Sequence, residues 1–412
     1  MTSPPPIPQK VGLTLAAIQL FFTLTWTVYV IFLPQLAAQV GLAKESVLLI
    51  LMMDQLIFLL ADTTMGLAAD RAVKVFGKLG RWVVLLTVAS CTAFLLLPLV
   101  ATQGAGVQWL FLTLTVVWSV TSSALRAPPL VLLGKYANVA AIPWLASLSF
   151  LGIGIAGAMA PYLTVHLREL DPRWPFAMSS LALLDATFGI AWAERTLKHQ
   201  GGAVALSASA ANGESLLSEP PKPPIPPFLI AMALLGIGFQ VHSSLNAAPQ
   251  YLRFAKPADL EMLLPIFWVG FNLLMLCASP LTRRYGGVLV MGIAGCVGAI
   301  AACVAAFAGS LNVLMAAQFV AGGAWGILMM SAFTAALLIG RTGREGLVTG
   351  SMFSLLALAA FVRMAAVAAQ LHKDAAFAVA LAWLPGVAWA AAGLVLLVMG
   401  WMLRRQSRAA SA

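Results

Sequence analysis

Twelve apolar runs, each long enough to cross a lipid bilayer as a helix, take up most of this chain. A helix needs about 20 apolar residues to span the hydrocarbon core. Only 9% of the 412 residues are charged, whereas soluble domains carry about 25% charged residues. We therefore predict an all-α integral membrane protein with twelve transmembrane helices near 13–33, 46–69, 82–101, 108–134, 144–165, 174–193, 227–250, 259–281, 287–308, 311–338, 347–370 and 376–403.

A segment of different composition, 194–226, separates the first six runs from the last six. It contains a Gly-Gly pair, Ser/Ala repeats and a proline-rich stretch, and this composition is too polar and too rich in proline to pack as a core. We interpret it as a linker between two pseudo-symmetric six-helix halves, 13–193 and 227–403. Short tails are expected at 1–12 and 404–412.

The distribution of Lys and Arg over the loops predicts the orientation of the chain. Cytoplasmic loops carry an excess of these residues. With the N-terminus placed in the cytoplasm, most of the 24 Lys and Arg residues fall on the cytoplasmic side. Both termini and the linker are therefore expected to be cytoplasmic, with the protein in the inner (cytoplasmic) membrane of a bacterium.

The composition argues against several other classes of protein. The net charge of +10 is spread over short loops without a basic patch of interleaved aromatic residues, so nucleic acid is not an expected partner. The sequence has no P-loop, no metal-spaced His/Cys cluster and no clustered nucleophile and base. We therefore expect no ATP-driven pump, no metal, no cofactor and no enzyme. The expected partners of this monomer are a small-molecule solute and the lipid bilayer.

A short motif follows the second run and recurs in altered form at 279–287 after the eighth. Its first copy reads Gly66-Leu67-Ala68-Ala69-Asp70-Arg71 and leads into a basic loop with Gly77, Lys78 and Arg81. Glycine permits close approach of helices, and the carboxylate and cations can tie the loop to neighbouring helix ends. The motif resembles the signature loop of the major facilitator superfamily, whose twelve spans and central linker match the whole chain. The resemblance implies two halves that rock about a central solute site.

A second resemblance is narrower. Asp62-Thr63-Thr64-Met65-Gly66 is similar to the end of the second span in the glycoside–pentoside–hexuronide cation symporters, the melibiose permease group, and 76–82 is similar to their following loop. This likeness implies that Asp62 takes the place of a carboxylate that binds the coupling cation. The second carboxylate of that group's pattern is Phe58 here. Because sodium requires several oxygen ligands, we expect the proton gradient, rather than sodium, to drive transport.

Four charged residues inside the apolar runs are candidates for coupling or gating: Asp54 and Asp62 in the second run, Arg126 in the fourth and Arg363 in the eleventh. A charge at the bilayer centre costs about 2.5–3.5 kcal/mol on insertion scales, so such residues usually serve a pathway or a coupling ion. The rise per residue places Asp54 and Arg363 at matched depth, and the resemblance implies that spans two and eleven face each other. We therefore predict an Asp54–Arg363 ion pair that can break when the solute binds.

Asp62 and Arg126 both fall in the half of the membrane nearer the cytoplasm. A neighbouring arginine alters the proton affinity of a carboxylate, so movement of Arg126 relative to Asp62 can switch the protonation of Asp62. The alternative interpretation of both charge pairs is structural. Membrane ion pairs also serve only to fasten helices together, and the sequence does not decide between these roles.

The resemblance places spans one, four, seven and ten around the solute cavity, and three of these spans carry the expected lining. Span one has a polar stripe at helical spacing. A tryptophan in the cavity can stack on a ring of the solute, although tryptophan also anchors helices at the membrane interface. The candidate cavity residues are Gln19, Thr23, Trp26, Gln240, His242, Asn246, Gln318 and Trp325.

These features predict a secondary active transporter that moves a small polar or anionic solute by alternating access, through proton symport. Two alternatives stay open. One is a proton-coupled exporter of a drug or metabolite, and the other is a non-transporting protein of the same fold that scaffolds assembly of a membrane complex. The intramembrane charges favour transport. An arginine-bearing cavity favours anions and the narrower resemblance favours sugars, so the sequence does not name the solute.

Overall fold

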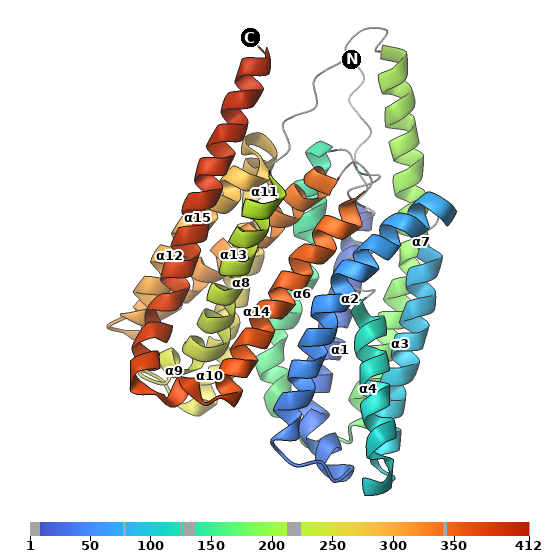
Figure 1. Ribbon diagram of the computed structural model, residues 1–412, viewed down its shortest axis with the longest axis vertical. Helices are drawn as coiled ribbons and strands as arrows, with labels where there is room; N and C mark the ends of the chain where they lie inside the picture. Colours follow the sequence, from blue (N-terminus) through green and yellow to red (C-terminus); the bar gives the residue numbers. More distant parts are fainter. Residues whose placement is uncertain are drawn as a thin grey trace.

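The protein is a bundle of long helices that run between two ends (Figure 1). The structure, a computed structural model, describes residues 9–76, 80–123, 126, 133, 137, 139–211, 224–340 and 344–411. Within them, 12 helical segments are long and apolar enough to cross a membrane. They coincide with the twelve apolar runs, so the prediction of an all-α protein with twelve spans is confirmed.

The N-terminal half contains six of these spans. They are formed by α1 Gln9–Gln39, α2 Ser46–Phe76, α3 Gly80–Ala101, α4 Gln108–Ser122, α6 Ile142–His166 and α7 Arg173–Ala211, with short 3-10 turns at η1 Ala105–Val107 and η3 Val139–Ala141.

The C-terminal half contains the other six. Its elements are α8 Ile225–Val241, η4 His242–Asn246, α9 Ala247–Tyr251, η5 Pro257–Asp259, α10 Leu260–Leu263, α11 Pro265–Tyr285, α12 Gly287–Ala306, α13 Leu311–Gly340, α14 Glu345–Ala368, η6 Leu371–Lys373 and α15 Ala375–Ser411. The seventh span is therefore continuous from α8 to α9 through η4, which is a π-helical turn. Such turns are frequently found at functional sites.

Two element boundaries differ from the sequence prediction. Helix α4 ends at Ser122 and Arg126 lies in a turn beyond it, whereas the fourth run was expected to be helical to 134; most of 124–134 lies outside the described residues. Hydropathy records residence in the membrane and not backbone conformation, so it does not mark the residue at which a helix ends. Helix α7 continues to Ala211 and so takes up half of the predicted linker. Alanine has the highest helix propensity, and alanine is frequent in this segment.

Helices α7 and α15 extend past the rest of the bundle at one end, which we call the linker end (Figure 1). The opposite end, where α1 passes into α2, is the far end. Large apolar side chains cover the outer surface, and Leu60, Met178 and Ile300 are 63%, 64% and 66% exposed. In water such a surface would be costly, whereas lipid tails solvate it, so the exposed leucines and isoleucines agree with a membrane location.

The two halves meet along two seams. In one, α2 packs along α14, and in the other α6 packs against α11, with α13 and α10 beside it. Small residues allow the backbones to approach. A Cβ at Gly66 would collide with the carbonyl of Gly346, and a Cβ at Gly350 would collide with the carbonyl of Asp62. The α2–α14 seam therefore requires glycine on both helices, as the motif at Gly66 predicted for a close approach.

Candidate functional site

A cavity of about 390 Å³ lies between the two halves. This volume falls in the range of about 300–1,000 Å³ that is typical of small-molecule sites. Five of the predicted cavity residues line it, namely Gln19, Thr23, Trp26, Gln240 and Trp325. Arg126 and Arg363 also line it, so two of the four intramembrane charges reach the same space.

A second cavity, of about 860 Å³, continues toward the far end. The two cavities share Thr23, Ile153 and Trp268 among their lining residues. The second is also lined by Arg168 and Pro257, which are exposed and lie in the connections at the far end. The central cavity is therefore approached from the far end.

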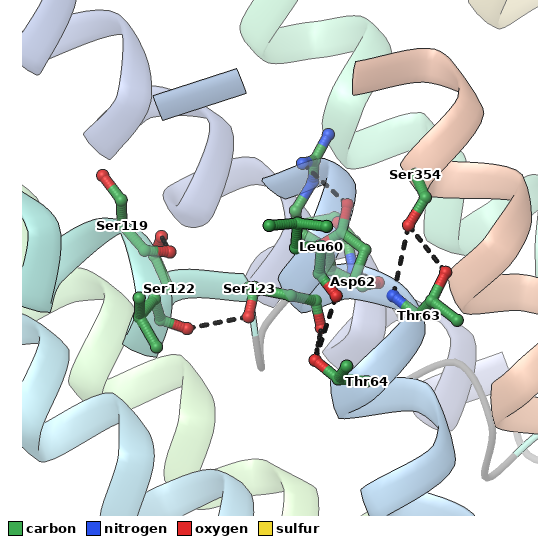
Figure 2. Close-up of polar contacts among 12 residues, drawn as sticks. Leu60, Asp62, Thr63, Thr64, Ser119, Ser122, Ser123 and Ser354 are labelled. Carbon is green, nitrogen blue, oxygen red and sulfur yellow. Dashed lines mark hydrogen bonds and ion pairs between the residues drawn. The ribbon is translucent and has the colours of Figure 1, made fainter. Parts of the chain in front are cut away.

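The linker end of the α2–α14 seam is closed by polar contacts between the halves. Asp70 of α2 accepts hydrogen bonds from the backbone N–H groups of Gly346 and Leu347, at 2.8 and 3.0 Å. These N–H groups belong to the first turn of α14, where backbone donors have no partner within the helix. Nearer the centre, the hydroxyls of Thr63 and Ser354 lie 2.8 Å apart (Figure 2). The predicted role of the motif carboxylate as a tie to a helix end matches this contact.

Two other motif residues lie in the described helices. Arg71 is exposed at the end of α2, and Arg81 is exposed at the start of α3. Gly77 and Lys78 fall outside the described residues.

Asp62 and Arg126 form an ion pair in the floor of the central cavity. The Nη1 atom of Arg126 lies 2.9 Å from a carboxylate oxygen of Asp62, which is completely buried, while Arg126 is 19% exposed. The guanidinium carbon lies 4.6 Å from the ring centroid of Phe58 and 5.8 Å from that of Phe353. Cation–π contacts of this kind stabilise a desolvated arginine. The sequence placed both charges in the same half of the membrane, and the structure brings them into contact.

The predicted Asp54–Arg363 ion pair is wrong for this structure. Asp54 is fully buried within the N-terminal half, where it accepts hydrogen bonds from Tyr29 at 2.8 Å and Ser119 at 2.6 Å. Arg363 donates its Nε–H to the amide oxygen of Gln240 at 3.0 Å. No ion pair to Arg363 is found within the described part of the chain.

The physical reason is helical phase. Residues of α2 and α14 do pack together as expected, but each residue turns the helix by about 100°. Asp54 lies nine residues before Thr63 and Arg363 lies nine residues after Ser354, so each charge points about 180° away from the residue that marks the seam on its own helix. Equal depth along two packed helices therefore does not determine which of their side chains meet.

Two of the polar residues predicted in the cavity take part in packing instead. His242 is buried, and its Nε2 lies 3.0 Å from the Oε1 of Gln318. Gln318 in turn donates to Gln250 at 3.1 Å and lines the second cavity. Asn246 donates its side-chain amide to the carbonyl of Leu381 at 2.8 Å. His242 and Asn246 line neither described cavity, because the π-helical turn directs them toward α13 and α15.

The sequence reasoning missed the aromatic character of the cavity. Its lining includes Phe22, Phe58, Phe150, Phe239, Trp268, Phe271 and Phe353. Phenylalanine facing lipid, a helix neighbour or a cavity gives the same hydropathy signal, so no pattern in the sequence separates these residues from the other apolar ones. Among the residues described, no group of His, Cys, Asp and Glu could hold a metal ion.

No protein-family model matches the sequence, and the search of curated proteins finds no match. Solved structures do match. The human organic anion transporter MFSD10 has a TM-score of 0.66 at 14% identity, over 97% of this chain and 100% of that chain. A bacterial homologue of the iron transporter ferroportin in an outward-facing state has a TM-score of 0.65 at 15% identity, over 94% and 99% of the two chains.

The E. coli fucose:proton symporter FucP has a TM-score of 0.62 at 12% identity, over 96% of this chain and 98% of that chain. Nearly the whole length of each chain is covered, so the similarity includes both halves and their arrangement. The chain therefore has the fold of the major facilitator superfamily.

Proposed function

We propose that this protein is a secondary active transporter that works by alternating access. The observation that carries the proposal is a central cavity between two six-helix halves, approached from the far end and closed at the linker end by the α2–α14 seam. Separation of that seam, with closure of the far end, would present the same cavity to the other side of the membrane. Moving a solute through this cavity by alternating access requires no chemical reaction, so an enzymatic activity is not proposed.

The linker end is proposed to be cytoplasmic because the loops on that side carry the excess of Lys and Arg. In this orientation the described state is open to the outside. The structures of the ferroportin homologue and of FucP, two of the matching proteins, are likewise in outward states. The inner membrane of a bacterium is the proposed location.

Proton coupling is proposed to act through Asp62 and Arg126. Asp62 is buried, and the only partner of its carboxylate among the described residues is Arg126. When the arginine moves away, a buried carboxylate is stabilised by taking up a proton. A solute that draws Arg126 toward itself would therefore promote protonation of Asp62, which links solute binding to proton movement.

The solute is proposed to be small and polar or anionic, and to be imported with protons. Two arginines line the cavity, which supports an anion. The names of the matching proteins include both an organic anion transporter and a sugar symporter, so they support transport of a small organic solute without selecting one class.

A reversible cross-link tests the alternating-access proposal. Cys91, Cys277, Cys296 and Cys303 are free thiols and are first replaced by alanine. Thr63→Cys/Ser354→Cys then places two thiols across the seam, where the native oxygens are 2.8 Å apart. The matched control is Thr282→Cys/Ser331→Cys, because these oxygens are 2.9 Å apart within the C-terminal half.

Transport is followed as a solute-induced pH change in proteoliposomes with a panel of sugars and organic acids. Oxidation is expected to abolish transport by the seam variant, reduction is expected to restore it, and the control is expected to stay active in both states. Full transport by the oxidised seam variant, with the disulfide verified by mass spectrometry, would contradict alternating access at this seam. No response to any solute in the panel would favour the scaffold alternative.

A further inference from the structure

We infer that the solute is an amphipathic aromatic monocarboxylate, whose carboxylate binds Arg363 and whose ring lies against Phe239 and Trp268. This inference rests on the proposed function and names the substrate class for the same cavity. It also decides between the anion and the sugar, which the sequence left open.

The charge of Arg363 supports an anionic solute. Arg363 lines the cavity, is partly buried, and pairs with the neutral amide of Gln240. A buried cation is costly unless it is paired with an opposite charge, and no carboxylate is found among the described residues that line this cavity. An anion that enters from the far end would supply the missing charge.

Arg126 is less suited to this role. Its charge is already compensated by Asp62 at 2.9 Å, and its guanidinium lies against Phe58 and near Phe353. Phe353 lies ten residues before Arg363 on α14, a rise of about 15 Å along the helix. A single carboxylate that enters from the far end therefore meets Arg363 before it meets Arg126.

An aromatic wall stands beside Arg363. Phe239, which precedes Gln240 in α8, stacks on Trp325 with ring centroids 4.3 Å apart and an interplanar angle of 4°. Trp268 meets Phe239 edge to face at 6.2 Å. Trp325 is buried, whereas Phe239 and Trp268 are partly exposed to the cavity. Aromatic pairs prefer offset or edge-to-face contacts, so an incoming ring finds partners of the same kind.

A sugar fits this lining poorly. Each desolvated hydroxyl requires a hydrogen-bond partner, and several polar groups of the lining are already engaged. Thr23 donates to the carbonyl of Gln19 at 2.7 Å, and the amide oxygen of Gln240 accepts from Arg363. The phenylalanine rings around them offer contact area and no conventional hydrogen bonds. The cavity therefore favours one charged group on an apolar body.

Binding to the purified protein in lipid nanodiscs, measured by isothermal titration calorimetry, tests this inference without requiring transport. The probes are indole-3-acetate, its neutral analogue indole-3-acetamide, acetate and L-fucose. Indole-3-acetate is expected to bind at least about tenfold more tightly than each of the others.

Two variants test the site by different routes. Arg363→Gln removes the cation, and Gln240→Glu keeps the size of the side chain but places a carboxylate beside Arg363. Each is expected to weaken binding of indole-3-acetate at least about tenfold and to leave weak binding of indole-3-acetamide unchanged. Arg173→Gln, which removes an exposed arginine outside the cavity, is the matched control and is expected to bind as the wild type does.

Equal binding of the acid and its amide, tighter binding of fucose, or no binding of indole-3-acetate would overturn the inference. So would wild-type affinity in a folded Gln240→Glu protein. Binding of indole-3-acetate without transport would support the inferred ligand class and contradict the proposed transport function. Transport of fucose that indole-3-acetate does not inhibit would support the proposed transport function and contradict the inferred substrate class.

Discussion

Removal of the Asp70 carboxylate is expected to open the linker end of the protein. Asp70 is 6% exposed and accepts two backbone N–H groups from the first turn of α14, at 2.8 and 3.0 Å. These bonds join the two halves, so they exist only while the α2–α14 seam is closed. When the seam separates, water replaces them on both sides. The net energy of the bonds therefore contributes directly to the equilibrium between closed and open linker ends.

The size of the effect follows from the two contacts. Hydrogen bonds to charged groups contribute about 1.5–3 kcal/mol each, so the lower figure gives about 3 kcal/mol for the pair. At 1.4 kcal/mol per factor of ten, Asp70→Ala should shift the equilibrium toward the open linker end by roughly 100-fold. Asp70→Asn keeps an acceptor oxygen but loses the charge, so about half of this free energy is expected to be lost. The equilibrium should then shift toward the open linker end by roughly tenfold.

Electron–electron distance measurements can detect this shift without a solute. Spin labels on Lys10→Cys and Arg283→Cys, in the background without native cysteines, mark exposed positions of the two halves at the linker end. The population with a longer distance between the two labels, which represents the open linker end, should increase in Asp70→Ala and increase less in Asp70→Asn.

The matched control is Asp259→Ala, because Asp259 also accepts a backbone N–H, at 2.8 Å, but does so within one half at the far end. An Asp70→Ala protein with the wild-type distance distribution, and with unchanged thermal stability, would refute the argument that these bonds hold the seam.

Three further predictions concern the charges and the seam. Asp62→Asn should uncouple solute movement from the proton gradient and retain solute exchange, and unchanged accumulation against a gradient would remove Asp62 from the coupling mechanism. Gly350→Ala should lower the free energy of unfolding by about 1–3 kcal/mol, because the added Cβ overpacks the seam. The measurement is the unfolding temperature, which should be lower than that of Gly309→Ala, where a Cβ meets open space. The stability losses of Asp54→Asn and Arg363→Ala should add within about 0.5 kcal/mol; a rescue in the double variant would show that the two charges interact in another state.

The twelve spans could be predicted because hydropathy is a local property. A run of about 20 apolar residues has few alternatives to a membrane helix, and the positions of Gly66 and Asp70 at the end of α2 marked the helix contact that the structure shows. The end of α4 at Ser122 could not be predicted in the same way. The hydropathy of a run does not change at the residue where a helix ends, so it carries no signal of that boundary.

Side-chain partners were harder to predict than helices because they depend on rotation about each helix axis. An error of one residue in phase turns a side chain by about 100°. Depth along the membrane is much less sensitive, since the same error moves the residue by only about 1.5 Å. This difference explains why Asp62 and Arg126 were placed correctly in the same half of the membrane, while Asp54 and Arg363 were matched in depth and yet point to different partners.

The position of Asp62 also explains how a proton could act on the seam. Asp62 precedes Thr63, whose hydroxyl contacts Ser354, and its own carbonyl lies against Gly350 of α14. Its side chain, on the same turn, reaches Arg126. A change in the ion pair therefore bears on a turn of α2 that packs against the opposite half, at a contact where a Cβ on Gly350 cannot be accommodated. The proposed coupling between protonation of Asp62 and opening of the seam can therefore act within this one turn of α2.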